Sequence, residues 1–370
     1  KHSLIYNPNE QVSHESLALT NHGVYFGLNI HVTSHLYYFS FDKKEAIEIP
    51  LEEKGQISNL VVSQKGVEFF YGLSSLNKPL SYFYGVKNEM KKKLTSLPSF
   101  FDHKSIILEQ KFVKSFDGTE VPYFLVYKKG IKFNGKNPTI LYGYGGFQIS
   151  LTPSFSNVLG KGWLEKGGVF VMANIRGGGE YGASWHQCAL KENRYKSYKD
   201  FFSVAEDLIS RKVCSPETLG AQGGSNGGLL MGVCYTQRPD LFKAINCQVP
   251  LLDMRKYHKL LAGYLWTSEY GNPDDPQVGK YIRDISPYHN VLENKKYPSI
   301  FINTSTKDDR VHPGHARKFT ALLESLGHEF LYYENTQGGH AGSLKYEDKA
   351  LVKALEFAFF SEKLGIKANK

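Results

Sequence analysis

The stretch Thr218–Thr236, TLGAQGGSNGGLLMGVCYT, contains the segment that decides the fold. Its first part, TLGAQGG, favours a β-strand, and its last part, LLMGVCYT, favours an apolar helix. Between them lies Gly223-Gly224-Ser225-Asn226-Gly227, a G-x-S-x-G motif followed by one more glycine. A strained turn of this kind presents its serine at the carboxyl edge of a sheet, and small neighbours let strand and helix approach. The pattern predicts Ser225 as a nucleophile, with a purely structural glycine turn as the alternative.

Apolar β runs alternate with helical stretches on both sides of this motif. Continuous apolar strands that alternate with helices are typical of a mainly parallel sheet covered on both faces. The sequence therefore predicts a doubly wound α/β-hydrolase domain over residues 108–370, which opens with a hairpin that turns at Asp117-Gly118. The expected strands are TILYGYGG, GVFVMANI, TLGAQGG, AINCQV, PSIFINTS and HEFLYYE, and the expected helices are 198–212, 226–237, 313–326 and 345–363.

The first 107 residues show a different pattern of short aromatic-rich strands. Two similar passes, at about 14–50 and 56–96, each carry several short β runs such as GVYFGLNI and VEFFYGLS. A period of about 40 residues with four short strands is typical of a β-propeller blade, although two blades do not close a ring. From these residues alone, part of a propeller and a small antiparallel sheet are equal alternatives for residues 1–107.

The net charge of +9 raises the question of nucleic-acid binding. The charge is scattered, and the one dense basic run, Lys91 to Lys93 with Lys87 nearby, has no interleaved aromatic residues. Such a run is typical of a solvated surface. We expect no nucleic-acid partner, and the sequence does not indicate an oligomeric state.

The cysteines and the termini indicate the compartment. Cys188, Cys214, Cys234 and Cys247 form no CxxC pair, which favours free thiols and a reducing compartment. No apolar run is long enough to span a membrane, and residues 1–11 do not resemble a secretory signal. Because the chain begins with Lys1, we expect a fragment or a processed form of a longer protein. The predicted location is the cytoplasm, or the periplasm if a signal is missing from this chain.

A serine nucleophile needs a histidine base and an orienting carboxylate, which follow it in the order Ser, Asp, His in this fold. Asp308 follows the strand PSIFINTS, and His340 lies in a glycine-rich loop after HEFLYYE. Asp309 is an equal rival to Asp308 on this reasoning. The pair His312 and His315 is a weak zinc candidate, because Pro313 indicates a helix start and a third ligand is missing. We expect no metal and no cofactor.

An oxyanion also needs hydrogen-bond donors. In this fold one is the backbone N–H after the nucleophile, here that of Asn226, and another comes from the loop after an early strand. That loop is Tyr142–Phe147, YGYGGF, in which a tyrosine hydroxyl is a possible donor. Core tyrosines in a glycine-rich turn are the alternative.

Six motifs together resemble the prolyl oligopeptidase family: YGYGGF at 142–147, NIRGGGEYG at 174–182, GGSNGG at 223–228, WTSEYGNP at 266–273, DDRVHP at 308–313 and GGHAG at 338–342. The resemblance covers essentially all of residues 108–370. It implies a triad of Ser225, Asp308 and His340, with Tyr144 and the Asn226 N–H as oxyanion donors. It also implies that the aromatic-rich passes are the last blades of a propeller that restricts entry to short peptides.

The resemblance further implies cleavage of short peptides on the carboxyl side of proline through an acyl-enzyme. Trp266 would stack on the proline ring, and Arg310 would bind a substrate carbonyl. The rest of the pocket would be Tyr270, Phe147, Val311 and Asn226. Glu269 leaves a basic specificity open, and an esterase of the same fold and a non-catalytic interaction module are further alternatives.

Overall fold

Two antiparallel sheets form the first part of the protein. The computed structural model describes residue 6 and residues 12–63 and 65–366, so most of the amino-terminal stretch 1–11 lies outside the described residues. The first sheet holds β1 (Val12–Leu19), β2 (Gly23–Ile30), β3 (Thr33–Ser40) and β4 (Glu45–Ile49). The second holds β5 (Gln56–Val62), β6 (Glu68–Ser75), β7 (Lys78–Val86) and β8 (Glu89–Ser96). In each sheet the strands pair in chain order, which is the arrangement of a propeller blade.

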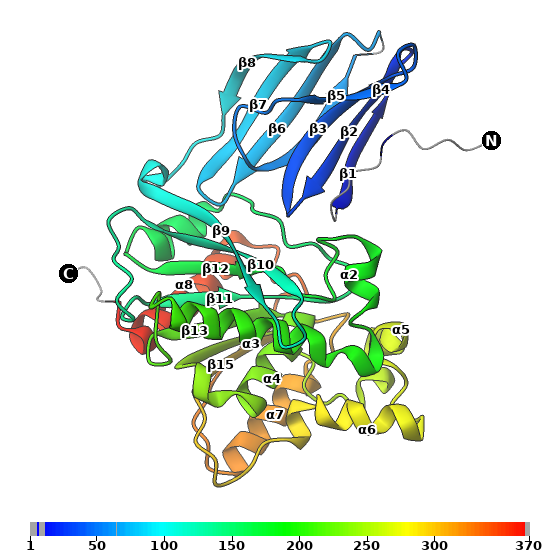
Figure 1. Cartoon of the computed structure of the whole chain (residues 1–370). Coiled ribbons are helices and arrows are strands. Elements are labelled where there is room, and N and C mark those ends of the chain that lie inside the picture. Colours follow the sequence, from blue (N-terminus) through cyan, green and yellow to red (C-terminus); the bar gives the residue numbers. More distant parts are fainter. Residues whose placement is uncertain (1–5, 7–11, 64, 367–370) are drawn as a thin grey trace.

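Alternation of buried and partly exposed residues explains why these segments form strands. In β7 every second residue is buried. Aromatic side chains from both sheets, among them Tyr25, Phe69, Tyr71 and Phe83, share one core. Figure 1 shows the two sheets side by side, above the α/β part of the chain.

The second part is built on an eight-stranded sheet in the order β16-β15-β14-β13-β11-β12-β10-β9. Its strands are β9 (Ile106–Lys114), β10 (Glu120–Lys128), β11 (Thr139–Tyr142), β12 (Val169–Ala173), β13 (Leu219–Gly224), β14 (Ala244–Gln248), β15 (Ser299–Ser305) and β16 (Leu331–Asn335). The pairs from β12 through β11 to β16 are parallel, whereas β10 pairs antiparallel with both β9 and β12. The predicted doubly wound sheet is thus confirmed. The expected boundary between residues 107 and 108 falls within β9, and the division into two domains stays a prediction.

The helices are α1 (Asn157–Leu159), α2 (Ala183–Gln187), α3 (Tyr195–Ser210), α4 (Asn226–Gln237), α5 (Thr267–Tyr270), α6 (Pro276–Asp284), α7 (Gly314–Ser325) and α8 (Tyr346–Leu364). Short 3-10 turns lie at 103–105, 191–193, 239–241, 257–259, 261–266 and 287–289, and a π turn lies at 160–164. The four longer helices expected from the sequence correspond to α3, α4, α7 and α8.

The helices cover both faces of the sheet because strand residues alternate between two cores. In β12, Val171 belongs to the core with α3, α4 and α7, while Phe170 and Met172 belong to the core with α8. Figure 1 shows α3 in front of the sheet and α8 behind it. The carboxyl ends of the parallel strands therefore meet at one edge between these layers, where loop residues can converge.

Hydrogen bonds join the amino-terminal sheets to the α/β part. His31 Nδ1 lies 2.9 Å from the Tyr181 hydroxyl, and Gln110 Nε2 donates to the His31 carbonyl. Asn77 Nδ2 also donates to the Ile106 carbonyl at 3.0 Å. The strand β9 is thus fastened to the loops at the ends of both sheets.

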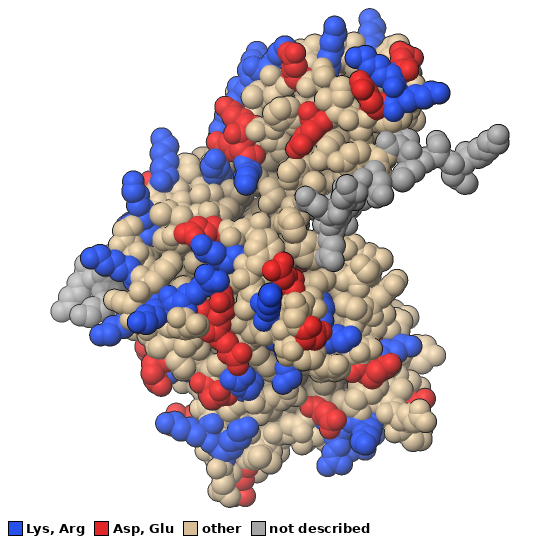
Figure 2. Space-filling model, in the orientation of Figure 1, with Lys and Arg blue, Asp and Glu red and all other residues tan. Residues whose placement is uncertain are grey.

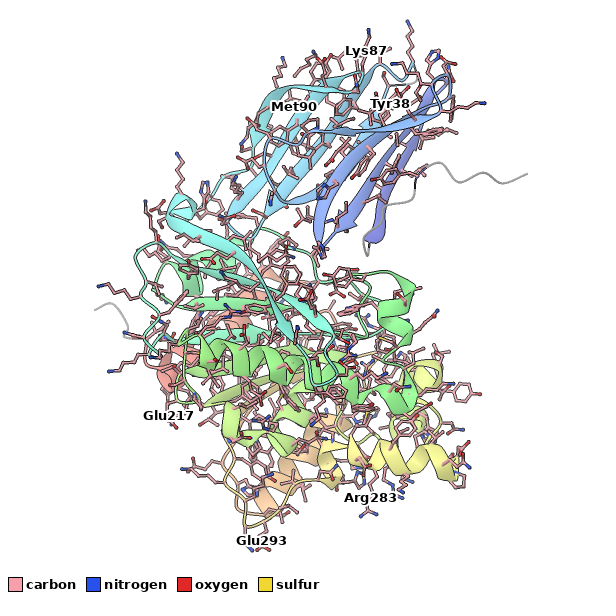
Figure 3. The ribbon with its side chains drawn as sticks, in the orientation of Figure 1. Tyr38, Lys87, Met90, Glu217, Arg283 and Glu293 are labelled. Atoms are coloured by element: carbon pink, nitrogen blue, oxygen red, sulfur yellow. The ribbon has the colours of Figure 1, made fainter. Side chains whose placement is uncertain are left out.

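Charges of both signs are mixed on the surface. On the face drawn in Figure 2, Lys and Arg lie among Asp and Glu over both parts of the molecule. The basic run lies in the exposed strand β8, and Figure 3 shows the neighbouring Lys87 and Met90 at the end of the sheets that lies far from the α/β part. Lysines on such a strand are a common way to discourage pairing with another chain. No helix in the described part of the chain is both long and apolar enough to cross a membrane.

Candidate active site

Ser225 lies in a strained turn between β13 and α4. Its backbone has φ 60° and ψ −114°, a conformation that is costly for a residue with a side chain. Close backbone approach explains the neighbouring glycines, because a Cβ on Gly227 would lie 2.7 Å from the Gly143 carbonyl oxygen. The Ser225 N–H donates to the Gln248 carbonyl at 2.9 Å, which fixes the turn against β14. The local structure is that of a nucleophile elbow.

Asp308 and His340 meet on loops that follow β15 and β16. The Asp308 Oδ2 lies 2.7 Å from His340 Nδ1, and both side chains are buried. The other oxygen, Oδ1, accepts from the backbone N–H groups of Arg310 and Val311 at 3.0 and 2.9 Å, so the carboxylate is held in one orientation. Asp309 is exposed. The geometry therefore brings Asp308, not Asp309, to the imidazole.

The serine and the histidine lie at the same edge of the sheet. Ser225 follows β13 directly, and His340 lies in the loop between β16 and α8. In the described part of the chain these two side chains make no direct hydrogen bond to each other. Such contacts often tighten only in the substrate complex.

The loop Tyr142–Phe147 lies against the start of α4. The Tyr144 side chain lies near Ser225, and burial raises the pKa of Tyr144 although the Arg194 charge opposes this rise. The phenol is therefore protonated near neutral pH and can donate. The amide of Asn226 donates from Nδ2 to the Tyr144 carbonyl at 2.5 Å, which couples the loop to the elbow.

Aromatic side chains pack against one another beside this loop, and we call this cluster the aromatic wall. The ring of Phe147 lies 6.4 Å from that of Trp266 and 5.7 Å from that of Tyr270, both in edge-to-face geometry. Phe147 itself adopts φ 55°, in the left-handed region. Val311 is buried, while Arg310 is exposed on the same loop as Asp308. The structure thus brings Phe147, Trp266 and Tyr270 together.

Glu269 is buried and has partners on both carboxylate oxygens. Its Oε1 accepts from Arg194 at 2.7 Å and from the Phe147 N–H at 2.8 Å, and its Oε2 lies 2.7 Å from His186 Nε2. A carboxylate neutralised in this way is a poor receptor for a substrate cation. The arrangement argues against the basic specificity that Glu269 left open.

Comparison with known proteins agrees with this geometry. The family model described as Prolyl oligopeptidase family matches residues 153–367, more than half of the chain. The chain belongs to the prolyl oligopeptidase family.

Curated proteins and solved structures similar to this chain include several peptidases. A curated "Uncharacterized peptidase" of Sinorhizobium fredii is 46% identical over 98% of this chain and 50% of its own length. The Prolyl endopeptidase of Elizabethkingia meningoseptica is 36% identical over 90% of this chain and 50% of its own length. A solved post-proline cleaving enzyme from Rickettsia typhi superposes with a TM-score of 0.90 at 37% identity, over 98% of this chain and 53% of that one. The chain therefore spans about half the length of these relatives.

His312 and His315, the two zinc candidates, have other hydrogen-bond partners. His315 Nδ1 accepts from the backbone N–H groups of Leu252 and Asp253 at 3.3 and 3.1 Å. Burial lowers the pKa of His315 to about 4, so its ring is neutral. His312 Nδ1 accepts from the Gly314 N–H at 2.9 Å. Among the described residues, no group of three or more His, Cys, Asp or Glu side chains is arranged to hold a metal.

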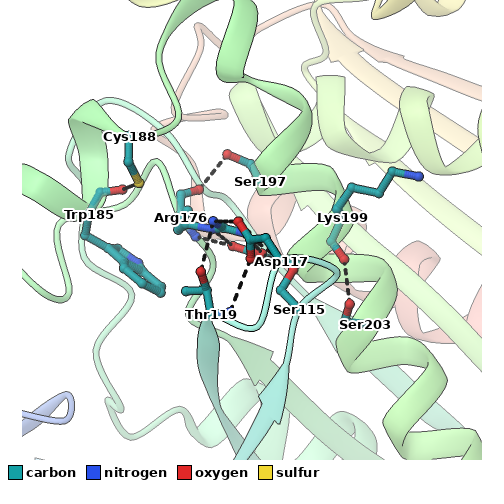
Figure 4. A network of polar contacts seen from close by, with 10 residues as sticks. Ser115, Asp117, Thr119, Arg176, Trp185, Cys188, Ser197, Lys199 and Ser203 are labelled. Carbon is teal, nitrogen blue, oxygen red and sulfur yellow. Dashed lines mark hydrogen bonds and ion pairs between the residues drawn. The ribbon is translucent and has the colours of Figure 1, made fainter.

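A second buried arginine, Arg176, joins separate elements of the α/β part. Arg176, from the NIRGGGEYG motif, donates to Asp200 at 2.6 and 2.8 Å and to Asp117 at 2.6 Å. Figure 4 shows Arg176 beside Asp117 and Thr119. Ser115 also donates to Asp200, at 2.6 Å. The network fastens the β9–β10 hairpin to α3. Sequence reasoning missed this network and the partners of Glu269, because they join residues far apart in the chain.

Proposed function

We propose that the chain carries the catalytic machinery of a serine peptidase that hydrolyses short peptides on the carboxyl side of proline. The observation that carries the proposal is the buried Asp308–His340 pair, 2.7 Å apart, at the same sheet edge as the strained Ser225. The supporting comparisons are the family match and the named prolyl endopeptidases among the relatives. Because the chain spans half of those relatives, the activity of the longer proteins is a proposal for it.

The chemistry follows from the roles of the three side chains. His340 accepts the Ser225 proton while the serine oxygen attacks the peptide carbonyl, and Asp308 orients the imidazole and stabilises its charged form. The tetrahedral oxyanion accepts from the Asn226 N–H and the Tyr144 hydroxyl. His340 then returns the proton to the leaving amine. In the second half of the reaction water attacks the acyl carbonyl while His340 takes its proton, and His340 gives the proton to the Ser225 oxygen as the carboxylic acid leaves.

Specificity for proline is supported by the aromatic pocket. Phe147 and Trp266 are partly exposed, with the buried Tyr270 packed against Phe147, and their aromatic surfaces suit a rigid pyrrolidine ring that needs no charged partner. Arg310, exposed on the loop beside Asp308, is suited to hydrogen-bond a substrate carbonyl. We assign the pocket to the proline side chain and Arg310 to the peptide backbone.

The organisation and location of the protein are also proposals. We assign residues 1–107 to two blades of a propeller and residues 108–370 to the catalytic domain. The two four-stranded sheets support the first assignment. All four cysteines are free thiols, which supports a reducing compartment such as the cytoplasm. Short peptides are the proposed partners, with no nucleic acid and no membrane.

A fluorophosphonate probe tests the nucleophile. The parent chain should be labelled at Ser225, and Ser225→Ala should lose labelling and reduce kcat by about 10⁴- to 10⁶-fold while unfolding at the same temperature. Ser203→Ala, which removes a partly exposed serine that donates to the Lys199 carbonyl within α3, is the matched control and should be labelled like the parent. Labelling that persists in Ser225→Ala removes this serine from its role.

Peptide and ester substrates separate the enzyme classes. A peptidase of this specificity should prefer an amide after proline over the matched amides after arginine and alanine. Turnover of short esters alone would mean an esterase of the same fold. An unlabelled, inactive parent chain would favour a non-catalytic module.

A further inference from the structure

Two buried charged residues lie directly behind the candidate oxyanion site. The Arg194 side chain is 1% exposed and that of Glu269 is 4% exposed, and they pair at 2.7 Å. They are 75 residues apart in the chain. A buried ion pair seldom adds net stability over apolar side chains of similar size, because desolvation offsets most of the attraction. We therefore ask which residues this ion pair positions rather than how much it stabilises the fold.

Three further contacts of the pair lead to residues of the candidate site. Arg194 donates from its second terminal nitrogen to Asn226 Oδ1, and its guanidinium lies 5.2 Å from the centre of the Tyr270 ring. The Tyr270 hydroxyl donates to the same Asn226 oxygen at 2.7 Å. Glu269 in turn accepts the Phe147 N–H at 2.8 Å. One ion pair thus touches the elbow, the oxyanion loop and the aromatic wall.

Asn226 transmits this arrangement to both proposed donors. Its own backbone N–H is one donor, and its side-chain Nδ2 holds the carbonyl of Tyr144, whose hydroxyl is the other. Because Arg194 orients the Asn226 amide, the amide nitrogen faces Tyr144 and the amide oxygen faces the charge. Oxyanion stabilisation depends on donors fixed at the position where charge develops, and a misplacement of about 1 Å lowers the rate about 100-fold.

We propose that Arg194 and Glu269 are positioning residues that set the separation of the two oxyanion donors, Tyr144 and the Asn226 N–H. His186, which bonds the second oxygen of Glu269, holds the carboxylate in place from the outer side. Neither charged group touches the substrate in this arrangement; each acts through Asn226 or through the loop that carries Tyr144. The inference rests on the proposed function and names additional residues for it.

A double-mutant cycle with Tyr144→Phe tests the inference. Arg194→Lys keeps the charge but does not reproduce the forked contact to both Glu269 and Asn226. On a proline amide it should lower kcat about 10- to 100-fold and change KM less than about threefold. In the Tyr144→Phe background the same substitution should lower kcat less than about threefold, because the donor that it misplaces is already absent.

A matched control separates positioning from loss of structure. Arg176→Lys alters an equally buried arginine with a buried carboxylate partner, and its effect should be the same in both backgrounds. If Arg194→Lys does not fold, Glu269→Gln, which keeps the size of the side chain, takes its place in the cycle. Equal losses in both backgrounds, or a loss confined to KM, would overturn the inference. Failure of the parent to react with the fluorophosphonate would instead overturn the proposed function.

Discussion

Replacement of Trp266 by alanine tests the proline pocket most directly. The substitution removes the indole that faces Phe147 at 6.4 Å and leaves the proposed triad and the proposed oxyanion donors in place. An activated ester with a small acyl group needs only the triad and the donors. A peptide with proline before the cleaved bond also needs the pocket. We therefore expect a large loss on the peptide and a small loss on the ester.

The size of the loss follows from the area that the indole covers. A pyrrolidine ring stacked on one face of Trp266 removes on the order of 100 Å² of apolar surface from water, worth about 2.5 kcal/mol at about 25 cal/mol per Å². At about 1.4 kcal/mol for each factor of ten, kcat/KM for the proline amide should fall about 60-fold. The ester should lose less than about threefold.

The assay compares kcat/KM for both substrates in parent and variant, with thermal unfolding as a check on the fold. Phe100→Ala removes an aromatic side chain that is 69% exposed, and it should leave both substrates unaffected. Equal losses on peptide and ester in Trp266→Ala would show that the indole supports the scaffold of the site. The assignment of the pocket to proline would then lose its physical basis.

Three further outcomes follow from the hydrogen bonds and pKa values. Tyr144→Phe should lower kcat for the proline amide by about 30- to 1000-fold with little change in KM, and steady-state kinetics that show only a KM effect would reassign Tyr144 to substrate binding. Burial raises the pKa of Glu180 from 4.5 to about 7, so the folded state binds a proton that the unfolded state has released in this range. Stability should therefore fall by up to about 3 kcal/mol as the pH rises from 4.5 to 7, and Glu180→Gln should flatten this slope in urea titrations; an unchanged slope would contradict the account. The hydrogen bond from Arg176 lowers the pKa of Asp117 from 3.8 to about 2, so its stabilisation is present above pH 4 and lost as the pH falls towards 2. Because the Asp117 side chain is 30% exposed, Asp117→Asn should remove less than about 1 kcal/mol of the acid-induced loss in unfolding free energy, and a larger effect would contradict it.

Local sequence patterns were sufficient to predict the helix that follows the Ser225 turn and one strand of the amino-terminal part. Helix α4 spans 226–237 as expected, and β2 coincides with GVYFGLNI, because apolar periodicity and glycines determine both. Helix α3 begins at Tyr195, earlier than the expected residue 198. A 3-10 turn at 191–193 leads directly into it, so the chain is already helical before the apolar periodicity becomes clear.

The choice between Asp308 and Asp309 needed more than spacing. Both follow β15 at nearly the same distance, so spacing barely separated them, and only the resemblance to the family favoured Asp308. In the structure the Asp308 carboxylate accepts the N–H groups two and three residues further on, an Asx turn that aims its second oxygen at His340. An aspartate that can form such a turn shortly before a proline that starts a helix is a pattern that sequence analysis can search for.

Glu269 shows why proximity in sequence was a poor guide to specificity. Three residues after Trp266, it looked like a receptor for a basic substrate side chain. A carboxylate can play that part only if one of its oxygens faces the pocket without a partner. Here Arg194 and His186 come from a segment more than 70 residues away and occupy both oxygens, together with the Phe147 N–H. The charge that the sequence offers to a substrate is thus already neutralised by the protein, which supports the proposal that the aromatic wall binds an apolar residue such as proline.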